Sequence, residues 1–212
     1  MNKPFKVLIC DDQNIPRLLF KMMIDNSGDY ELAGELSKAD DAIEFISSHD
    51  VDLCITDVVM KEGRNGLNAA AAIKERFPEV KVIVTTSMPD DSYLKYAREI
   101  GVESFWYKEM NDMPLIEVMN RTMRGESVYP EEAPVVDIGW MKSNELTERE
   151  LDVLRLMTEG FTDQEMADEL GISKTTVRTH INHMCEKSGL SRVRLAIEAK
   201  ALGIAFTDRG RL

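Results

Sequence analysis

Several features that would place this chain in other protein classes are scarce or missing. Its longest apolar stretches are far shorter than the roughly 18 residues of a membrane-spanning helix, so we expect no contact with a membrane. Residues 1–6 pass directly into a strand pattern and do not resemble a signal peptide. The three cysteines (Cys10, Cys54 and Cys185) are an odd number without paired spacing, which indicates neither a disulfide framework nor a zinc site. These observations favour a cytoplasmic protein.

Basic charge is also scarce, but it is unevenly distributed. The 212 residues carry a net charge of −12, and residues 1–141 alone hold 26 acidic against 15 basic residues. Residues 172–200, in contrast, hold six basic residues and two acidic ones. Contacts with phosphates act over about 10 Å, so a local basic segment matters more for nucleic acid than the total charge. The acidic total therefore does not exclude DNA binding.

The N-terminal part alternates strand and helix patterns. Short apolar runs predict strands at residues 5–10, 30–36, 53–56, 81–85 and 104–107. Helical periodicity follows each of them, at residues 15–26, 39–48, 67–77, 92–100 and 114–124. Five such repeats predict an α/β domain of (βα)5 flavodoxin-like architecture, with a parallel sheet covered by helices on both faces. We place this domain at residues 1–125.

Polar residues follow four of these strands. Asp11 and Asp12 follow the first strand, Asp57 the third, Thr86 the fourth and Lys108 the fifth. Parallel strands end at one edge of a sheet, which is where open α/β sheets bind ligands. Neighbouring carboxylates suit Mg²⁺, and a lysine suits a phosphate. Taken singly these residues would be helix caps, a turn residue and a surface lysine; their joint placement favours a phosphoryl-handling site.

The remainder of the chain divides into a linker and a helical domain. Residues 126–144 contain two prolines and a glycine without a regular period, which predicts a linker. Residues 145–212 are predicted to form a small all-α domain, with helices at 151–159, 166–170, 174–187 and 192–202. Capping boxes begin at Thr147 and Thr162, and Ser173 and Ser191 are further candidate caps.

The second and third of these helices have helix-turn-helix spacing. Ala167 suits a close helix crossing, Gly171 suits a left-handed turn, and Val177 suits burial between the two helices. On the third helix, Thr175, Arg178, Thr179 and Asn182 fall opposite the apolar face.

An arginine and an asparagine on one polar face suit the DNA major groove, where they can read guanine and adenine. Lys174, Arg192 and Arg194 flank this face and are candidates for phosphate contacts. The alternative is an ordinary solvated face of a helical bundle.

Both parts resemble one family. Residues 3–124, with Asp11-Asp12, Asp57, Thr86-Ser87 and Lys108 in order, resemble a response-regulator receiver domain. Residues 145–206 resemble a LuxR-type helix-turn-helix, in the segments 146–150 and 171–180. In this order the two resemble a response regulator of the NarL/FixJ type.

The resemblance implies a role for each residue of the site. Asp57 would accept a phosphoryl group from a sensor histidine kinase, and Asp11, Asp12, Asp57 and the carbonyl of Val59 would bind Mg²⁺. Thr86 and Lys108 would hold phosphoryl oxygens, and Phe105 would change rotamer together with Thr86. The expected function is a transcriptional regulator that binds promoter DNA as a homodimer when phosphorylated.

Two alternatives and a possible dimer face remain open. Lys61 stands where the family usually has proline, and Gly63 makes the loop one residue longer, which leaves room for a regulator that does not depend on phosphate. A phosphatase would need a second acid where Val59 stands, so we expect no enzyme. Val193, Ala196, Ile197, Lys200 and Ala201 form either a dimer face or part of the domain core.

Overall fold

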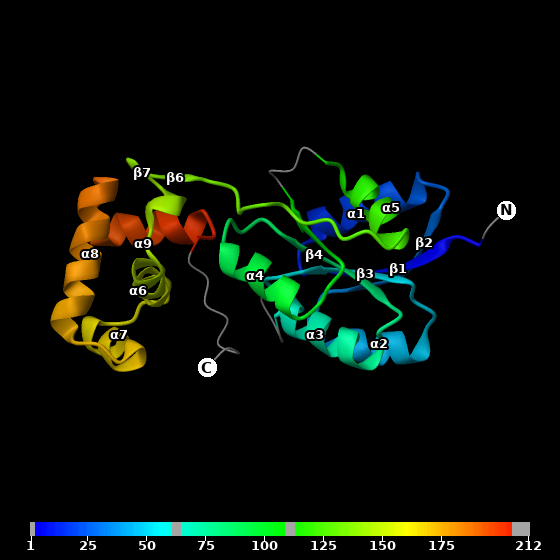
Figure 1. Ribbon diagram of the computed structural model, residues 1–212, viewed down its shortest axis with the longest axis horizontal. Helices are drawn as coiled ribbons and strands as arrows, with labels where there is room; N and C mark the ends of the chain where they lie inside the picture. Colours follow the sequence, from blue (N-terminus) through cyan, green and yellow to red (C-terminus); the bar gives the residue numbers. More distant parts are fainter. Residues whose placement is uncertain (1–2, 61–64, 109–112, 205–212) are drawn as a thin grey trace. The chain divides into compact units, whose positions relative to one another are not determined.

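The computed structural model describes residues 3–60, 65–108 and 113–204 (Figure 1). The chain folds into two compact units. The first is made of residues 1–87 and 91–132, and the second contains residues 133–212. Within the described residues, no helix is both long and apolar enough to cross a bilayer.

A five-stranded parallel sheet forms the centre of the first unit. Its strands are β1 (Phe5–Cys10), β2 (Tyr30–Leu36), β3 (Leu53–Asp57), β4 (Lys81–Thr86) and β5 (Ser104–Tyr107). Their order across the sheet is β2-β1-β3-β4-β5, and every neighbouring pair is parallel. The chain moves outward from β1 to β2 and then crosses back to β3, so the order reverses between β1 and β3. Ligands bind at such reversal points in open α/β sheets. The expected fold class is confirmed, with strand ends within one residue of the prediction.

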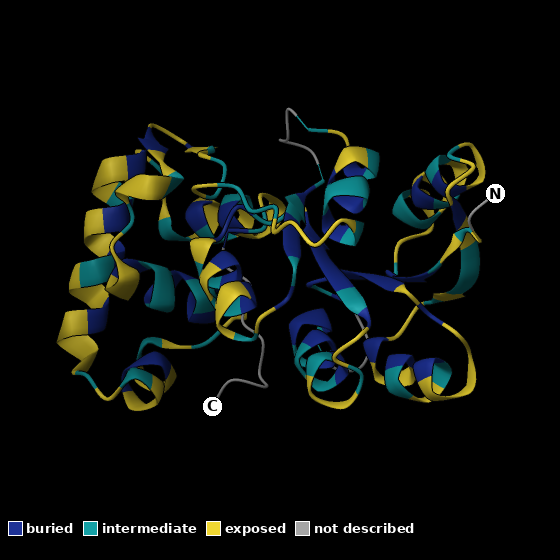
Figure 2. Ribbon diagram, turned by 45° about the vertical axis from the view of Figure 1, so that its right-hand side comes forward, coloured by how far each residue is buried: buried dark blue, intermediate teal, exposed yellow. Residues whose placement is uncertain are grey.

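Helices cover both faces of this sheet. Helices α1 (Asn14–Asp25) and α5 (Leu115–Met123) lie on one face, and α2 (Ala42–Ser48), α3 (Gly66–Arg76) and α4 (Asp91–Glu99) lie on the other (Figure 1). The expected helix at 39–48 is divided, because its first turn is the 3-10 helix η1 (Ala39–Asp41). Strands β1, β3, β4 and β5 are mostly buried, the edge strand β2 is mostly half-buried or exposed, and each helix buries one side only (Figure 2). Burial on both faces explains why the four other strands are mostly apolar, whereas β2 carries two glutamates.

The segment after α5 returns to the edge of the sheet. Val128 pairs with Ser104 in a parallel bridge, and its carbonyl accepts a hydrogen bond from the backbone N–H of Phe105 at 2.9 Å. The hydroxyl of Tyr129 donates to the carbonyl of Val102 at 2.7 Å. The first part of the segment expected to be a linker is thus attached to β5.

The second unit begins with a small hairpin. Strands β6 (Asp137–Ile138) and β7 (Met141–Lys142) are antiparallel, and the 3-10 helix η2 (Ser143–Glu145) follows. Ile138 and Met141 are fully buried in the core that the helices of this unit share. Sequence reasoning placed these residues in the linker because strands of two residues are too short to show a period.

Four helices form the rest of the second unit: α6 (Glu148–Thr158), α7 (Asp163–Leu170), α8 (Lys174–Ser188) and α9 (Arg192–Ala201). Both expected capping boxes are present, and α6 and α7 begin directly after Thr147 and Thr162. Each therefore starts three residues before the first apolar position, because the cap hydrogen bonds support a charged first turn. Gly171 adopts the expected left-handed conformation, with φ 63°.

Glu150 connects two of these helices. Its carboxylate accepts hydrogen bonds from the Thr147 backbone and from Nζ of Lys187 on α8, at 2.9 and 2.8 Å. Burial alone would raise the pKa of Glu150, but the hydrogen bonds from Lys187 and Thr147 outweigh it and lower that pKa. The buried carboxylate is therefore ionised and paired, and it fixes the start of α6 against α8.

Candidate functional site

Three carboxylates meet at the C-terminal edge of the sheet. Oxygens of Asp11, Asp12 and Asp57 all lie within 4.8 Å of one another. Asp11 and Asp57 are buried, and Asp12 is half-buried. Nζ of Lys108 reaches Oδ2 of Asp11 at 2.6 Å and Oδ1 of Asp57 at 2.8 Å. The structure thus brings together side chains that follow β1, β3 and β5.

The loop that begins α1 fixes the position of Asp11. Oδ1 of Asp11 accepts a hydrogen bond from the backbone N–H of Gln13 at 2.8 Å, and its backbone carbonyl accepts one from Arg17. Both carboxylate oxygens of Asp11 are therefore engaged, one by Lys108 and one by the backbone. Arg17 was missed by sequence reasoning, because a lysine or arginine on the first turns of a helix carries no distinctive signal.

Gly66 fixes the position of Asp57. A Cβ atom at residue 66 would lie 1.8 Å from the Asp57 carbonyl oxygen, far inside van der Waals contact. The backbone N–H of Gly66 donates to the Val58 carbonyl at 3.0 Å. Only glycine allows α3 to begin this close to the end of β3. Sequence reasoning gave Gly66 no role in the site.

The cluster carries an excess of negative charge. Lys108 bridges two of the three carboxylates, and burial raises the pKa of Asp57 to about 6. The Lys108 ammonium opposes that rise, whereas the charges of Asp11 and Asp12 add to it. Three carboxylates within reach of one another offer hard oxygen donors, so these residues fit a divalent cation such as Mg²⁺. Val59, the fourth expected ligand, is half-buried in the loop that follows β3.

The two expected switch residues lie in the core beside this cluster. Thr86 ends β4 with 1% of its surface exposed, and its carbonyl accepts a hydrogen bond from the Lys108 backbone at 2.8 Å. Phe105 is also 1% exposed, and its ring meets Tyr107 edge-on at 5.1 Å and stacks near Tyr129 at 6.5 Å. Lys61 and Gly63, the two departures from the family pattern, lie outside the described residues.

The second unit presents the expected polar face. On α8, Val177, Ile181 and Met184 are buried in the core. The candidate DNA contacts Lys174, Thr175, Arg178, Thr179, Asn182 and Arg194 are exposed, and Arg192 is half-buried. The alternation of buried and exposed positions follows the 100° steps expected of an amphipathic helix.

Two of these cations share one carboxylate. Asp163, the first residue of α7, accepts hydrogen bonds from Nε of Arg178 at 2.8 Å and from Nη1 of Arg192. Sequence reasoning did not single out Asp163, because only the packing of α7, α8 and α9 brings the three side chains together.

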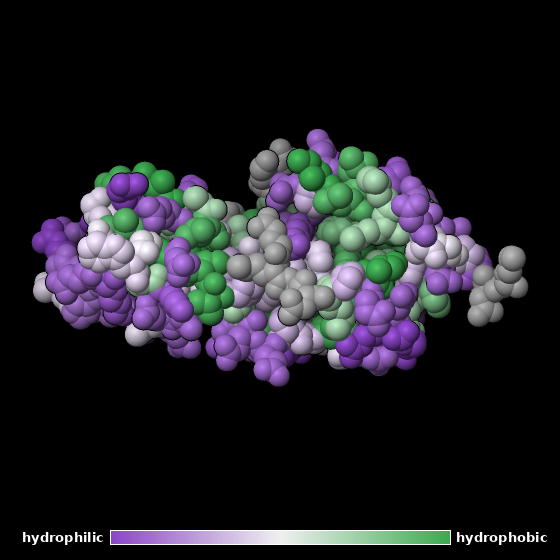
Figure 3. Space-filling model, turned by 90° about the horizontal axis from the view of Figure 1, so that it is seen from above, coloured by the Kyte–Doolittle hydropathy of each residue, from purple (hydrophilic) through white to green (hydrophobic). Residues whose placement is uncertain are grey.

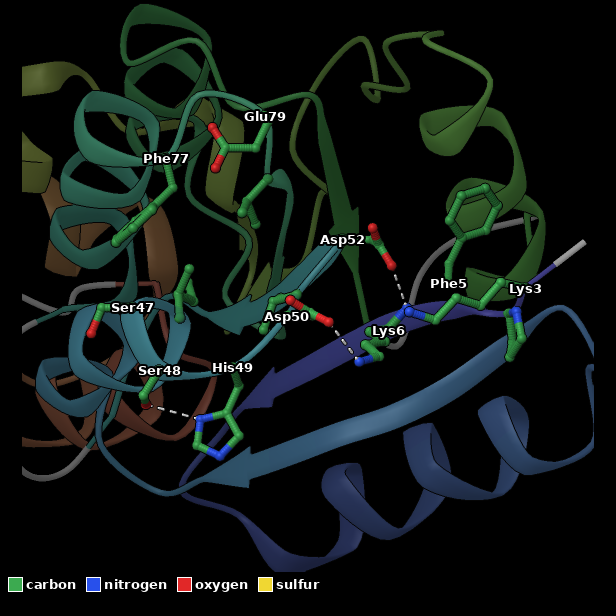
Figure 4. Close-up of a pocket in the computed structure, with 14 residues that line it drawn as sticks. Lys3, Phe5, Lys6, Ser47, Ser48, His49, Asp50, Asp52, Phe77 and Glu79 are labelled. Carbon is green, nitrogen blue, oxygen red and sulfur yellow. Dashed lines mark hydrogen bonds and ion pairs between the residues drawn. The ribbon is translucent and has the colours of Figure 1, made fainter.

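A hollow at the opposite edge of the sheet does not contribute to this chemistry. It has a volume of about 700 Å³ and lies where β1 and β3 begin (Figure 4). Its central charged residues are engaged locally: Lys6 pairs with Asp50 at 3.0 Å, and Asp52 accepts the Lys6 backbone N–H at 2.7 Å. Strand direction places it away from the carboxylate cluster, so it is not part of the candidate site.

Two helices expose apolar side chains. On α1, Ile15, Leu18, Leu19 and Met22 are 52–74% exposed. Hydrophobic side chains gather on the side of the first unit that carries α1 and α5 (Figure 3). On α9, Val193 and Ile197 are 67% and 61% exposed, Lys200 and Ala201 are exposed, and Ala196 is half-buried. Four of these α9 residues therefore form a surface, whereas Ala196 packs against the core that Leu195 and Ala199 enter.

Sequence comparisons match both units to known families. Residues 7–120 match the response regulator receiver domain, and residues 144–199 match the bacterial regulatory proteins of the luxR family. The chain is 32% identical over 187 residues to the response regulator protein VraR of Staphylococcus aureus strain Mu3, covering 86% of this chain and 89% of VraR. It is 31% identical to VraR of Staphylococcus saprophyticus, covering 87% and 90%.

Comparisons with solved structures agree on the fold. RcsB, solved as two dimers bound to two parallel DNAs, is similar with a TM-score of 0.59 and 23% identity, covering 94% of this chain and 99% of RcsB. RcsB of Salmonella enterica serovar Typhimurium, bound to a promoter with the phosphomimetic BeF3⁻, gives a TM-score of 0.60 at 22% identity, covering 94% and 100%.

Proposed function

This chain belongs to the response-regulator family, with a receiver domain followed by a LuxR-type DNA-binding domain, and we propose that phosphorylation of Asp57 controls its binding to promoter DNA. The observation that carries the proposal is the position of Lys108, whose ammonium bridges Asp11 and Asp57 beside a third carboxylate. As a regulator of promoters, it would act in the cytoplasm.

The chemistry follows from the side chains. An Oδ of Asp57 attacks the phosphorus of a phosphohistidine on a sensor kinase; the new O–P bond forms as the N–P bond breaks, and the imidazole leaves. Lys108 binds a phosphoryl oxygen, and the Thr86 hydroxyl donates to another. Asp11, Asp12, Asp57 and the Val59 carbonyl would hold Mg²⁺. When bound, the metal neutralises charge that gathers during transfer.

The aromatic residues Phe105 and Tyr129 connect the site with the segment that follows α5. As Thr86 moves toward the phosphoryl group, it leaves space into which the Phe105 ring turns. Phe105 lies beside Tyr129, and the backbone of Phe105 is bonded to Val128. Arg98 of α4 adds to this contact: its guanidinium lies 5.0 Å from the centre of the Tyr129 ring and donates to the Pro130 carbonyl at 3.1 Å. A change at Phe105 therefore reaches the segment that leads to the DNA-binding domain.

Two exposed apolar surfaces suit the expected partners. The surface of α1 begins at Ile15, three residues after Asp12, so a kinase bound there would have its phosphohistidine near Asp57. The surface of α9 suits a second copy of this chain, and RcsB is dimeric in its solved DNA complex. A dimer of this kind reads two half-sites about 34 Å apart.

Incubation with acetyl phosphate and Mg²⁺, followed by phosphate-affinity electrophoresis, tests the acceptor. We expect a shifted band for wild type and for the control Asp25→Asn, an exposed acid on α1, but none for Asp57→Asn or in the presence of EDTA. A wild-type protein that gives no shift would instead support a regulator independent of phosphate. Repeated turnover of a phosphomonoester would support an enzyme.

A further inference from the structure

Asp163 binds two of the cations that are expected to contact DNA. Its side chain is 13% exposed, whereas those of Arg178 and Arg192 are 62% and 41% exposed. The three residues lie on α7, α8 and α9, so one carboxylate connects the three helices that form the DNA-binding surface. Within residues 172–200 the six basic residues exceed the acidic ones by four. Asp163 lies outside this segment, and its negative charge offsets part of the segment's positive charge.

The geometry at Arg178 leaves its outer edge available. Asp163 accepts from Nε, and among the described residues the hydrogen bonds of the Arg178 guanidinium do not involve its two terminal nitrogens. A guanine presents O6 and N7 to a pair of such donors. A guanidinium held at Nε has lost much of its rotamer freedom before DNA arrives, so less conformational entropy is lost when it binds a base.

The same contact lowers attraction to phosphates. The hydrogen bonds from Arg178 and then Arg192 lower the pKa of Asp163, so the carboxylate is ionised at neutral pH. A fixed negative charge beside two cations reduces the positive potential that a phosphate meets, and affinity for any DNA sequence depends on that potential. The alignment of Arg178 strengthens binding to a specific sequence. Binding to random sequence does not gain from that alignment and is weakened by the reduced positive potential.

We propose that Asp163 determines sequence specificity: it aligns Arg178 for a guanine and restrains Arg178 and Arg192 from binding the phosphates of random DNA. This proposal rests on the proposed DNA-binding function. A purely structural role for Asp163 is the alternative, because an acid in the first turn of α7 also stabilises that helix through its dipole.

The test uses the full-length protein with BeF3⁻ and two DNA probes. One is a duplex selected from a random library by the wild-type protein, and the other is a scrambled duplex of the same composition. Fluorescence anisotropy gives Kd for each, at several salt concentrations. For Asp163→Asn we expect tighter binding to the scrambled duplex and a steeper salt dependence. We define the specificity ratio as Kd for the scrambled duplex divided by Kd for the selected duplex. We expect Asp163→Asn to lower this ratio by about tenfold, which lies within the range of one bidentate base contact.

A matched control and a double variant separate specificity from charge and folding. Asp168→Asn removes the same charge from an exposed position of α7 and should leave the ratio unchanged. In an Arg178→Gln background, Asp163→Asn should no longer reduce the ratio, because the alignment by Asp163 acts through Arg178, whereas releasing Arg192 strengthens phosphate contacts with both duplexes alike. Circular dichroism and the thermal midpoint of each variant report folding.

The outcomes are distinct. A ratio unaltered by Asp163→Asn, an equal change in Asp168→Asn, or a fall that persists in the Arg178→Gln background would overturn the role of Asp163 and leave the DNA-binding function standing. If the wild-type protein cannot tell the two duplexes apart, the proposed DNA-reading function fails, and the role of Asp163 fails with it.

Discussion

At the scale of single residues, the proposed chemistry depends on the electrostatic imbalance around Asp57. Asp57 is 3% exposed, and it lies beside two other acids with Lys108 paired to it and to Asp11. Burial is the largest influence on its pKa, which rises to about 6. A carboxylate that is costly to ionise is one that gains from a bound cation, so protons and Mg²⁺ should compete for it.

We therefore predict that Mg²⁺ binding depends on pH in a defined direction. Below about pH 6 Asp57 is protonated in the metal-free protein, and Mg²⁺ must displace that proton. The apparent affinity should fall by up to about tenfold per pH unit below that value and level off above it. Isothermal titration calorimetry between about pH 5 and 7.5 measures this. Asp57→Asn should bind weakly without that dependence; a wild-type affinity that is constant across the range would contradict the prediction.

Residues also show where sequence reasoning was limited. The acids, Thr86 and Lys108 could be located because each directly follows an apolar strand, and parallel strands end at one edge. Gly66 and Asp163 could not, because their roles depend on close approaches between segments: Gly66 to the Asp57 carbonyl, and Asp163 to arginines on two other helices. Such contacts have no local periodicity.

At the scale of elements, the strands were easier to predict than the segment that connects the two units. Uniform apolar runs define strands that are buried on both faces, and capping boxes define where α6 and α7 begin. The hairpin of β6 and β7 has too few residues for a pattern, although Ile138 and Met141 complete the core of the second unit. Tertiary packing, rather than local propensity, decides the structure there.

The exposed surface of α9 carries the prediction at this scale. Val193→Asp combined with Ile197→Asp should weaken dimerisation of the BeF3⁻-treated protein by at least about tenfold, because burying each aliphatic side chain contributes about 1.5–3 kcal/mol. Sedimentation velocity measures the dimer. Val135→Asp, at an apolar residue of the second unit that is 42% exposed, is the control and should dimerise normally. A double variant that dimerises like wild type would exclude α9 as the interface.

At the scale of the whole molecule, charge added at one edge of the receiver sheet must alter a DNA-binding surface in a different unit. The segment that joins the two is bonded to β5 through Val128 and Tyr129, beside the buried Phe105. Phosphorylation need not create a new structure; it needs only to favour one of two. About 5.5 kcal/mol of preference takes a population from 1% to 99% active.

DNA affinity with and without BeF3⁻ tests this account most directly. The affinity of the full-length protein for its selected duplex is measured with and without BeF3⁻ and Mg²⁺, for wild type, Asp57→Asn and the control Asp25→Asn. We predict that BeF3⁻ raises the affinity of wild type and of Asp25→Asn and leaves that of Asp57→Asn unchanged. An Asp57→Asn variant that responds like wild type, or a wild type that does not respond, would contradict the control of DNA binding by Asp57.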